Sequence, residues 1–218
     1  MGLRLPESVR DWYGRDGATE ILANHSNGDA VILVSQFAMK QSLSRQLLPF
    51  QVENQGVCEW SIMLDGSDDP PVYVDVDSNG AEWHLQAPTF SDHVRACVWD
   101  YKMVLGQPAL VEAQNAPLSP ESIEFLEHSF HAEPRTFGWP GDTQYRFSGH
   151  CQAVLIWSAE GQADWFVGAT DGASLEAALR TIWDLDRVGK SFYSSSEISE
   201  AVLANICRDV NEPPDPVW

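Results

Sequence analysis

The segment from Val57 to Leu64 constrains the fold of this chain most strongly, because its side chains alternate with a period of two residues. Cys58, Trp60, Ile62 and Leu64 fall on one side, and Val57, Glu59, Ser61 and Met63 fall on the other. This is the period of a β-strand with one buried face and one partly wet face. The segment therefore predicts a strand that covers a core with one of its faces.

Turn-forming residues separate this strand from others. In this region the candidate strands are, in order, Phe50 to Glu53, Val57 to Leu64, Val72 to Val76 and Glu82 to Gln86. Further candidate strands are Ala30 to Phe37, Gln152 to Ser158 and Asp164 to Ala169. Pro70 and Pro71 end the loop that begins at Asp65, since proline cannot donate to a ladder of hydrogen bonds. Asp77-Ser78-Asn79-Gly80 joins the last two strands of this region, and Asn-Gly favours a hairpin turn. Strands in this order predict an antiparallel meander.

Several segments carry helix signals. They are Pro6 to Ala23, a helix capped by Ser91 or Asp92 that ends at Gly106, a helix opened by Ser119-Pro120-Glu121, a helix from Ser174, and Glu197 to Val210. Residues 107–119 are expected to be a loop, or a linker. The sequence predicts a single α+β domain over residues 1–218, in which helices cover an antiparallel sheet, with a loose tail at 211–218.

Acidic residues dominate one stretch of the chain. Between Arg45 and Arg95 there is no Lys or Arg but there are nine acids, and the whole chain has a formal net charge of −19. A one-signed stretch on strand-like sequence predicts an electronegative face. Its natural partner is a basic molecule, whereas nucleic acid is disfavoured because like charges repel.

The four cysteines, Cys58, Cys97, Cys151 and Cys207, are widely spaced and each lies in an apolar sequence context. A chain this long with so few cysteines does not predict a disulfide framework, so a reducing compartment is expected. The first residues carry no secretory signal, and no apolar run approaches the ~20 residues that span a bilayer. These features predict a cytoplasmic protein without membrane contact.

Two patterns resemble metal sites, but both favour another explanation. Asp75-x-Asp77-x-Asn79-Gly80 matches the first six positions of a calcium loop, yet Gln86 stands where a bidentate Glu is required. Because its flanks look like strands, a plain hairpin is favoured. His128 and His131 have two glutamates nearby, and are favoured as solvated residues at a helix end. No metal and no cofactor are expected.

Common signatures of catalysis are missing from the sequence. It has no Gly-x-Ser-x-Gly elbow, no phosphate-binding Gly-rich loop and no dinucleotide fingerprint. His150-Cys151 are adjacent on an expected strand, where neighbouring side chains point to opposite faces. Paired carboxylates for glycoside hydrolysis stay open, because spacing in sequence does not report separation in space. The sequence therefore predicts a protein that is not an enzyme.

Two runs carry a family resemblance. Glu53 to Trp60 reads ENQGVCEW and Asp68 to Val74 reads DDPPVYV. These runs resemble the SUKH superfamily, which includes the yeast cell-wall-assembly regulator and many bacterial immunity proteins. Leu5 to Trp12 resembles the first helix of that family. Asp164 to Ala169, with the helix from Ser174, is similar to its closing strand and helix.

The resemblance implies a helix-covered antiparallel sheet without catalytic residues, which binds and neutralises a bacterial toxin, often a nuclease. An acidic binder would steer a basic toxin domain towards itself. The candidate toxin-binding residues are Glu59, Asp65, Asp68, Asp69, Asp75 and Asp77. Trp60 and Tyr73 are further candidates, but Trp60 shares a face with Cys58 and is expected in the core. A regulatory scaffold that binds cellular proteins, and an enzyme of unrecognised type, are the alternatives.

Overall fold

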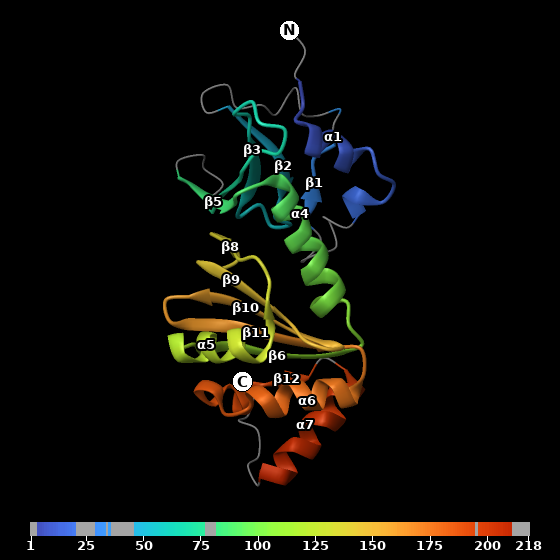
Figure 1. Cartoon of the computed structure of the whole chain (residues 1–218), viewed down its shortest axis with the longest axis vertical. Helices are drawn as coiled ribbons and strands as arrows, with labels where there is room; N and C mark the ends of the chain where they lie inside the picture. Colours follow the sequence, from blue (N-terminus) through green and yellow to red (C-terminus); the bar gives the residue numbers. More distant parts are fainter. Residues whose placement is uncertain are drawn as a thin grey trace. The chain divides into compact units, whose positions relative to one another are not determined.

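Figure 1 presents the structure, which is a computed structural model that describes residues 4–20, 29–33, 35, 46–76, 82–194 and 196–210. The chain divides into two compact units. Unit 1 comprises residues 1–101 and 136–139, and unit 2 comprises residues 102–135 and 140–218. Each unit has an antiparallel sheet and a hydrophobic core of its own. The predicted α+β class, with antiparallel sheets covered by helices, is confirmed.

The two cores bear on the expected domain organisation. Each unit has about half of the chain, and a chain segment of that length can bury a core of its own. A single folding domain over residues 1–218 stays a prediction. One cooperative unfolding transition shared by both units would support it.

The sheet of unit 1 is a meander of five strands in the order β1-β2-β3-β4-β5. The strands are β1 (Ala30–Val31), β2 (Leu47–Val52), β3 (Glu59–Met63), β4 (Val72–Asp75) and β5 (Trp83–Ala87). Each pairs antiparallel with the next, and the sequence predicts this meander for β2 to β5. The predicted turn at residues 77–80 lies outside the described residues.

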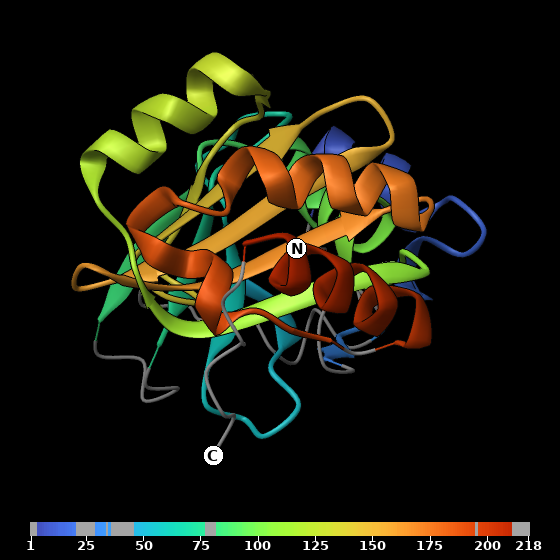
Figure 2. The ribbon, with the colours of Figure 1, turned by 90° about the horizontal axis from the view of Figure 1, so that it is seen from below.

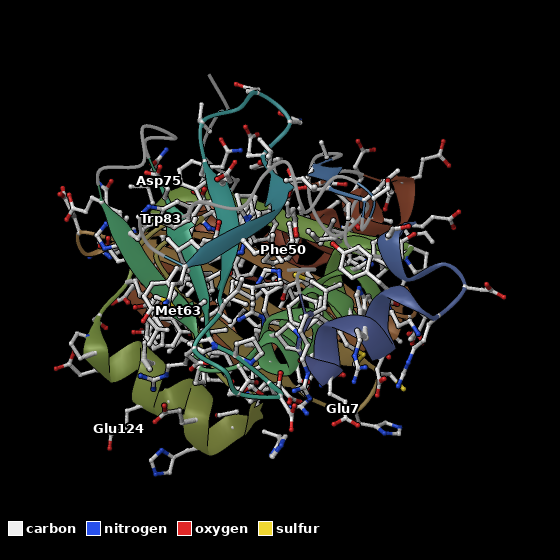
Figure 3. The ribbon with its side chains drawn as sticks, turned by 90° about the horizontal axis from the view of Figure 1, so that it is seen from above. Glu7, Phe50, Met63, Asp75, Trp83 and Glu124 are labelled. Carbon is white, nitrogen blue, oxygen red and sulfur yellow. The ribbon has the colours of Figure 1, made fainter. Side chains whose placement is uncertain are left out.

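The core of unit 1 lies between this sheet and two helices. Trp60 is buried, as expected, with Ile62 on the same face of β3, and Cys58 just before the strand is buried in the same core. Phe50 of β2 is also fully buried, and its ring meets the ring of Phe90 edge-on at 5.4 Å between centroids. Figure 3 shows Phe50 among the interior side chains. Burying such a side chain contributes roughly 1.5–3 kcal/mol.

The helices of unit 1 differ at their ends from the prediction. Helix α1 (Glu7–Tyr13) stops at Gly14, the chain turns through Gly17 at φ 77°, and residues 18–20 are helical again. The expected end at Ala23 lies outside the described residues. Helix α4 (Phe90–Trp99) is capped by Thr89, whose hydroxyl oxygen accepts from the backbone N–H of Asp92 at 3.0 Å. The caps predicted at Ser91 or Asp92 are therefore wrong. A π-helical segment, η1 (Asp100–Leu105), continues α4 up to Gly106.

The sheet of unit 2 has the order β12-β6-β11-β10-β9-β7. In that order its strands are Tyr193–Ser194, Ala109–Pro117, Gln162–Ala169, Gln152–Ala159, Thr143–Ser148 and His131–Ala132. The short strand β8 (Thr136–Phe137) belongs to the residues of unit 1. The expected loop or linker at residues 107–119 is wrong over most of its length, because β6 occupies it. Its small residues Ala109, Ala113 and Ala116 are buried in the core.

Helices cover the sheet of unit 2 (Figure 2). They are α5 (Pro120–Ser129), α6 (Gly172–Ile182), the 3-10 helix η2 (Leu185–Ser191) and α7 (Glu197–Val210). Leu175, Leu179 and Ile182 of α6 are buried in the core, as their spacing predicts. Asp171 caps α6 by accepting from the backbone N–H of Ser174 at 2.8 Å, so the helix begins before the predicted Ser174. None of the helices in the described part of the chain is long and apolar enough to cross a bilayer.

Candidate functional site

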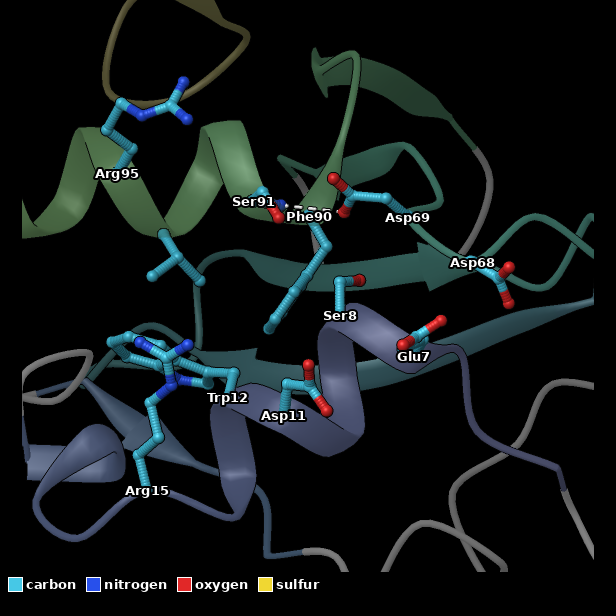
Figure 4. A pocket seen from close by; sticks show the side chains of 11 residues that line it. Glu7, Ser8, Asp11, Trp12, Arg15, Asp68, Asp69, Phe90, Ser91 and Arg95 are labelled. Carbon is cyan, nitrogen blue, oxygen red and sulfur yellow. Dashed lines mark hydrogen bonds between the residues drawn. The ribbon is translucent and has the colours of Figure 1, made fainter.

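A groove of about 470 Å³ opens on unit 1 between α1, the first turns of α4 and the loop at residues 65–71 (Figure 4). Its lining residues come from these three segments. They are Glu7, Ser8, Asp11, Trp12, Arg15, Asp68, Asp69, Phe90, Ser91, Val94 and Arg95. We call this site the acidic groove.

The loop at residues 65–71 is held by both helices. The backbone N–H of Ser8 donates to the carbonyl of Asp68 at 3.0 Å, and that of Phe90 donates to the carbonyl of Pro70 at 2.7 Å. The carboxylate of Asp69 accepts from the backbone N–H of Ser91 at 3.0 Å. Because hydrogen bonds fix the loop at both sides, the groove is formed before any ligand arrives.

The groove has an apolar floor. Phe90 and Val94 are buried beneath it, and Phe90 is fixed against Phe50. Trp12 of α1 is partly exposed and lines the same wall. In Figure 4 the ring of Phe90 projects from the start of α4 towards α1, with Asp11 and Trp12 on the α1 side. The floor offers an aromatic surface for a ligand that also carries charge.

Charge is segregated along the groove. Four carboxylates and two guanidinium groups line it. Glu7, Asp68 and Asp69 stand at one end in Figure 4, while Arg15 and Arg95 stand at the other. Arg95 is engaged by Asp92, with 2.8 Å between nitrogen and oxygen. The acidic end is therefore the part of the groove with the larger unneutralised charge.

The structure brings some of the predicted toxin-binding residues into the groove. Asp68 is exposed and Asp69 is partly exposed, and both line it. Asp65 is exposed on the same loop, outside the groove lining. Its carboxylate accepts from the backbone N–H of Ser67 at 2.9 Å, and this hydrogen bond lowers the pKa of Asp65. Asp65 thus remains charged, but its first role is to shape the loop.

The strand acids lie elsewhere. Glu59 of β3 and Asp75 of β4 are register partners, and Asp75 also faces Trp83 of β5 (Figure 3). Only 2% of Asp75 is exposed, so the prediction that it displays its carboxylate to a partner is wrong. The register partners of Asp75 on the same face, Glu59 of β3 and Trp83 of β5, stand on both sides of it. Glu59 is partly buried, and Asp77 lies outside the described residues.

The sequence prediction missed the contribution of α1 to the groove. Glu7, Asp11 and Arg15 follow one another at intervals of four residues, as do Ser8 and Trp12. Residues four apart lie on one face of a helix. This spacing was the signal that could have joined α1 to the acids of the loop.

A second polar cluster, also missed, lies inside unit 1. Nδ1 of His93 lies 2.7 Å from Oε1 of Gln86, and Nε2 of His93 lies 3.5 Å from the sulfur of Cys97. Gln86, His93 and Cys97 thus stand in the order of an orienting group, a base and a nucleophile. His93 is only 1% exposed and Cys97 only 4%, and neither lines the acidic groove. At this burial the cluster satisfies polar groups in the core, and no reactive surface is presented.

The other patterns weighed for metal binding or catalysis can also be placed. Over the described ranges, no three His, Cys, Asp or Glu side chains gather as a cation site. Nδ1 of His128 lies 2.7 Å from the carbonyl oxygen of Glu124 on α5, and His131 begins β7. His150 and Cys151 lie in the turn between β9 and β10, where Cys151 has φ 64°. Their expected place on a strand is wrong, and so is the apolar setting expected for Cys151, which is exposed.

Comparisons of the chain with models of protein families, with curated proteins and with solved structures each found no match.

Proposed function

We propose that this chain is a non-catalytic binding protein of the SUKH type, which neutralises a basic bacterial toxin in the cytoplasm. The acidic groove is the observation that carries the proposal. It combines a preformed apolar floor with exposed carboxylates, and the chain as a whole has a net charge of −19. Such a surface favours a basic protein over nucleic acid, whose phosphates it would repel.

The family resemblance and the groove support each other at one place. The run Asp68 to Val74, which resembles the SUKH superfamily, contains the two loop acids that line the groove. The opening Leu5 to Trp12, which also carries the resemblance, supplies Glu7, Asp11 and Trp12. Two of the segments behind the resemblance thus supply part of the proposed binding surface.

Affinity capture followed by a growth assay tests this function. The full chain is immobilised and used to capture proteins from the source cells, in parallel with a variant in which Asp11 and Asp68 are replaced by Asn. A captured protein is then expressed alone and together with the chain. We expect it to stop growth alone and to be tolerated with the chain. Normal growth when it is expressed alone would contradict an immunity role and favour the regulatory scaffold.

A further inference from the structure

We propose that the acidic groove receives an arginine side chain of the partner protein, followed along the same segment by an acidic side chain. This inference rests on the proposed function and adds the chemistry of the anchoring residues. It follows from what the groove offers along its length, from the Glu7 end to the Arg15 end.

The exposed carboxylates of Asp11 and Asp68 suit a guanidinium group better than an ammonium group. A guanidinium is planar and can bond a carboxylate with two parallel N–H groups. A lysine ammonium is a strongly hydrated point charge and lacks this paired geometry. Asp11 and Asp68 come from α1 and from the loop at residues 65–71, and both line the groove.

The order of charges along the groove fixes the direction in which the partner's segment lies in it. Glu7 and Asp68 lie towards the starts of α1 and α4, and Arg15 lies beyond the end of α1. A segment with its arginine near Asp68 and its acid near Arg15 meets opposite charge at both ends. The reversed segment meets like charge at both ends, which is unfavourable.

The size of the groove agrees with a short segment of chain. Its volume of about 470 Å³ falls within the range of roughly 300–1,000 Å³ that ligand sites occupy. A groove of this kind holds one or two side chains and not a whole helix. The remaining contact with the partner would come from the surrounding surface of unit 1.

Peptide titration followed by NMR tests the inference directly. The probe is the capped peptide Ala-Arg-Ala-Ala-Glu-Ala, added to the isotope-labelled full chain at low salt. Three matched peptides replace Arg by citrulline, replace Arg by Lys, or exchange the positions of Arg and Glu. Citrulline keeps the shape of arginine but is neutral, so it isolates the charge.

We expect shifts of the backbone amides at residues 7–15, 68–69 and 90–95. The citrulline peptide should bind roughly tenfold more weakly, because it loses the charge of its hydrogen bonds. The lysine and reversed peptides should also bind more weakly. Binding should fall by a similar factor in the Asp11→Asn, Asp68→Asn variant. It should be unchanged in a control with Glu124→Gln and Glu200→Gln, which removes the same charge from exposed positions of unit 2.

Several outcomes would overturn the inference. They are shifts confined to other residues, equal binding of the arginine and citrulline peptides, and no binding of any peptide. The peptide comparison uses the unaltered chain, so it does not depend on how the variants fold. If the inference fails but a captured toxin is still neutralised, the proposed function stands and the anchor lies elsewhere.

Discussion

The carboxylate of Asp69 accepts a hydrogen bond from the backbone N–H of Ser91 at 3.0 Å, and this contact joins the loop at residues 65–71 to the first turn of α4. An anionic side chain at this end of a helix satisfies a free N–H group and is favoured by the helix dipole. One residue earlier, Asp68 offers only its backbone carbonyl to α1 and leaves its carboxylate exposed. The two neighbouring acids therefore have different roles, since one builds the groove and the other is free to bind.

Stability measurements should separate these roles. We expect Asp69→Ala to lower the free energy of unfolding by about 1 kcal/mol, because a helix N–H loses its acceptor. Asp68→Ala should change it by less than about 0.5 kcal/mol, as for most surface substitutions. Urea denaturation of the full chain, followed by tryptophan fluorescence, measures both. Equal losses in the two variants would contradict the assignment.

Close backbone packing in unit 2 gives a second prediction. A Cβ atom added at Gly168 of β11 would lie 2.7 Å from the Cα of Val104 and 2.8 Å from its carbonyl oxygen. Backbone cannot move aside as a side chain can, so Gly168→Ala should cost about 1–3 kcal/mol or more. Gly149→Ala is the control, since the atoms nearest to its Cβ would belong to the flexible side chain of Gln152. The shift in melting temperature should be clearly larger for Gly168→Ala.

The strands of unit 1 could be predicted because local pattern and tertiary structure agree there. The alternation from Val57 to Leu64 is that of a sheet with one covered face, and β3 forms within it. In β6 the local sequence pattern and the tertiary structure disagree. The strand is lined by small residues such as Ala109 and Ala113, which have no strong strand preference. The neighbouring strands β11 and β12 decide its structure, and they lie far away in sequence.

The candidate site could be predicted in part for a similar reason. Asp68 and Asp69 follow a strand in a proline-rich loop, and such residues are exposed or bonded locally whatever the fold. Asp75 looked equivalent by charge, but its burial depends on the pairing of β4 with both β3 and β5. The meeting of α1 with this loop depends on tertiary contacts that are some sixty residues apart in the chain, such as Ser8 to Asp68.

Thiol reactivity should follow burial. Burial raises the pKa of the Cys58 thiol well above its usual range, and the carboxylates of Asp29, Glu53 and Asp75 add to the shift. Burial also raises the pKa of Cys207. N-ethylmaleimide reacts with the thiolate form, and it is added at pH 7.5 in steps of about 1 equivalent. Exposed Cys151 should react first, whereas Cys58 and Cys97 should react only after denaturation. Mass spectrometry of the labelled peptides measures the order. Early labelling of Cys58 would show that the core at the start of β3 is not covered as described.

Tyr193 of β12 should make stability depend on alkaline pH. Its hydroxyl donates to a carboxylate oxygen of Glu112 on β6 at 3.0 Å. Burial, with this hydrogen bond and the charge of Glu112, raises the pKa of Tyr193 to about 12. In the unfolded chain the pKa of this tyrosine is ~10, so as the pH rises the unfolded chain loses this proton before the folded chain does. The stabilisation is thus complete below that pH and is lost as the pH rises towards the folded value.

Denaturation at pH 8 and pH 11 tests this assignment. The free energy of unfolding of the unaltered chain should fall between the two values by more than that of the Tyr193→Phe variant. At pH 8 the variant should be less stable by roughly 0.5–1.5 kcal/mol, which is typical of one hydrogen bond. An identical fall in both proteins would contradict the role given to Tyr193.

The central claim is that the acidic groove of unit 1 binds a basic protein, and the association rate of the captured partner tests it most directly. The rate constant is measured at low and at high salt for the unaltered chain, for the Asp11→Asn, Asp68→Asn variant and for the Glu124→Gln, Glu200→Gln control. We predict association about tenfold slower for the groove variant at low salt, because steering by charge is lost, and a smaller difference at high salt. Equal rates for the groove variant and the control at both salt concentrations would contradict the claim.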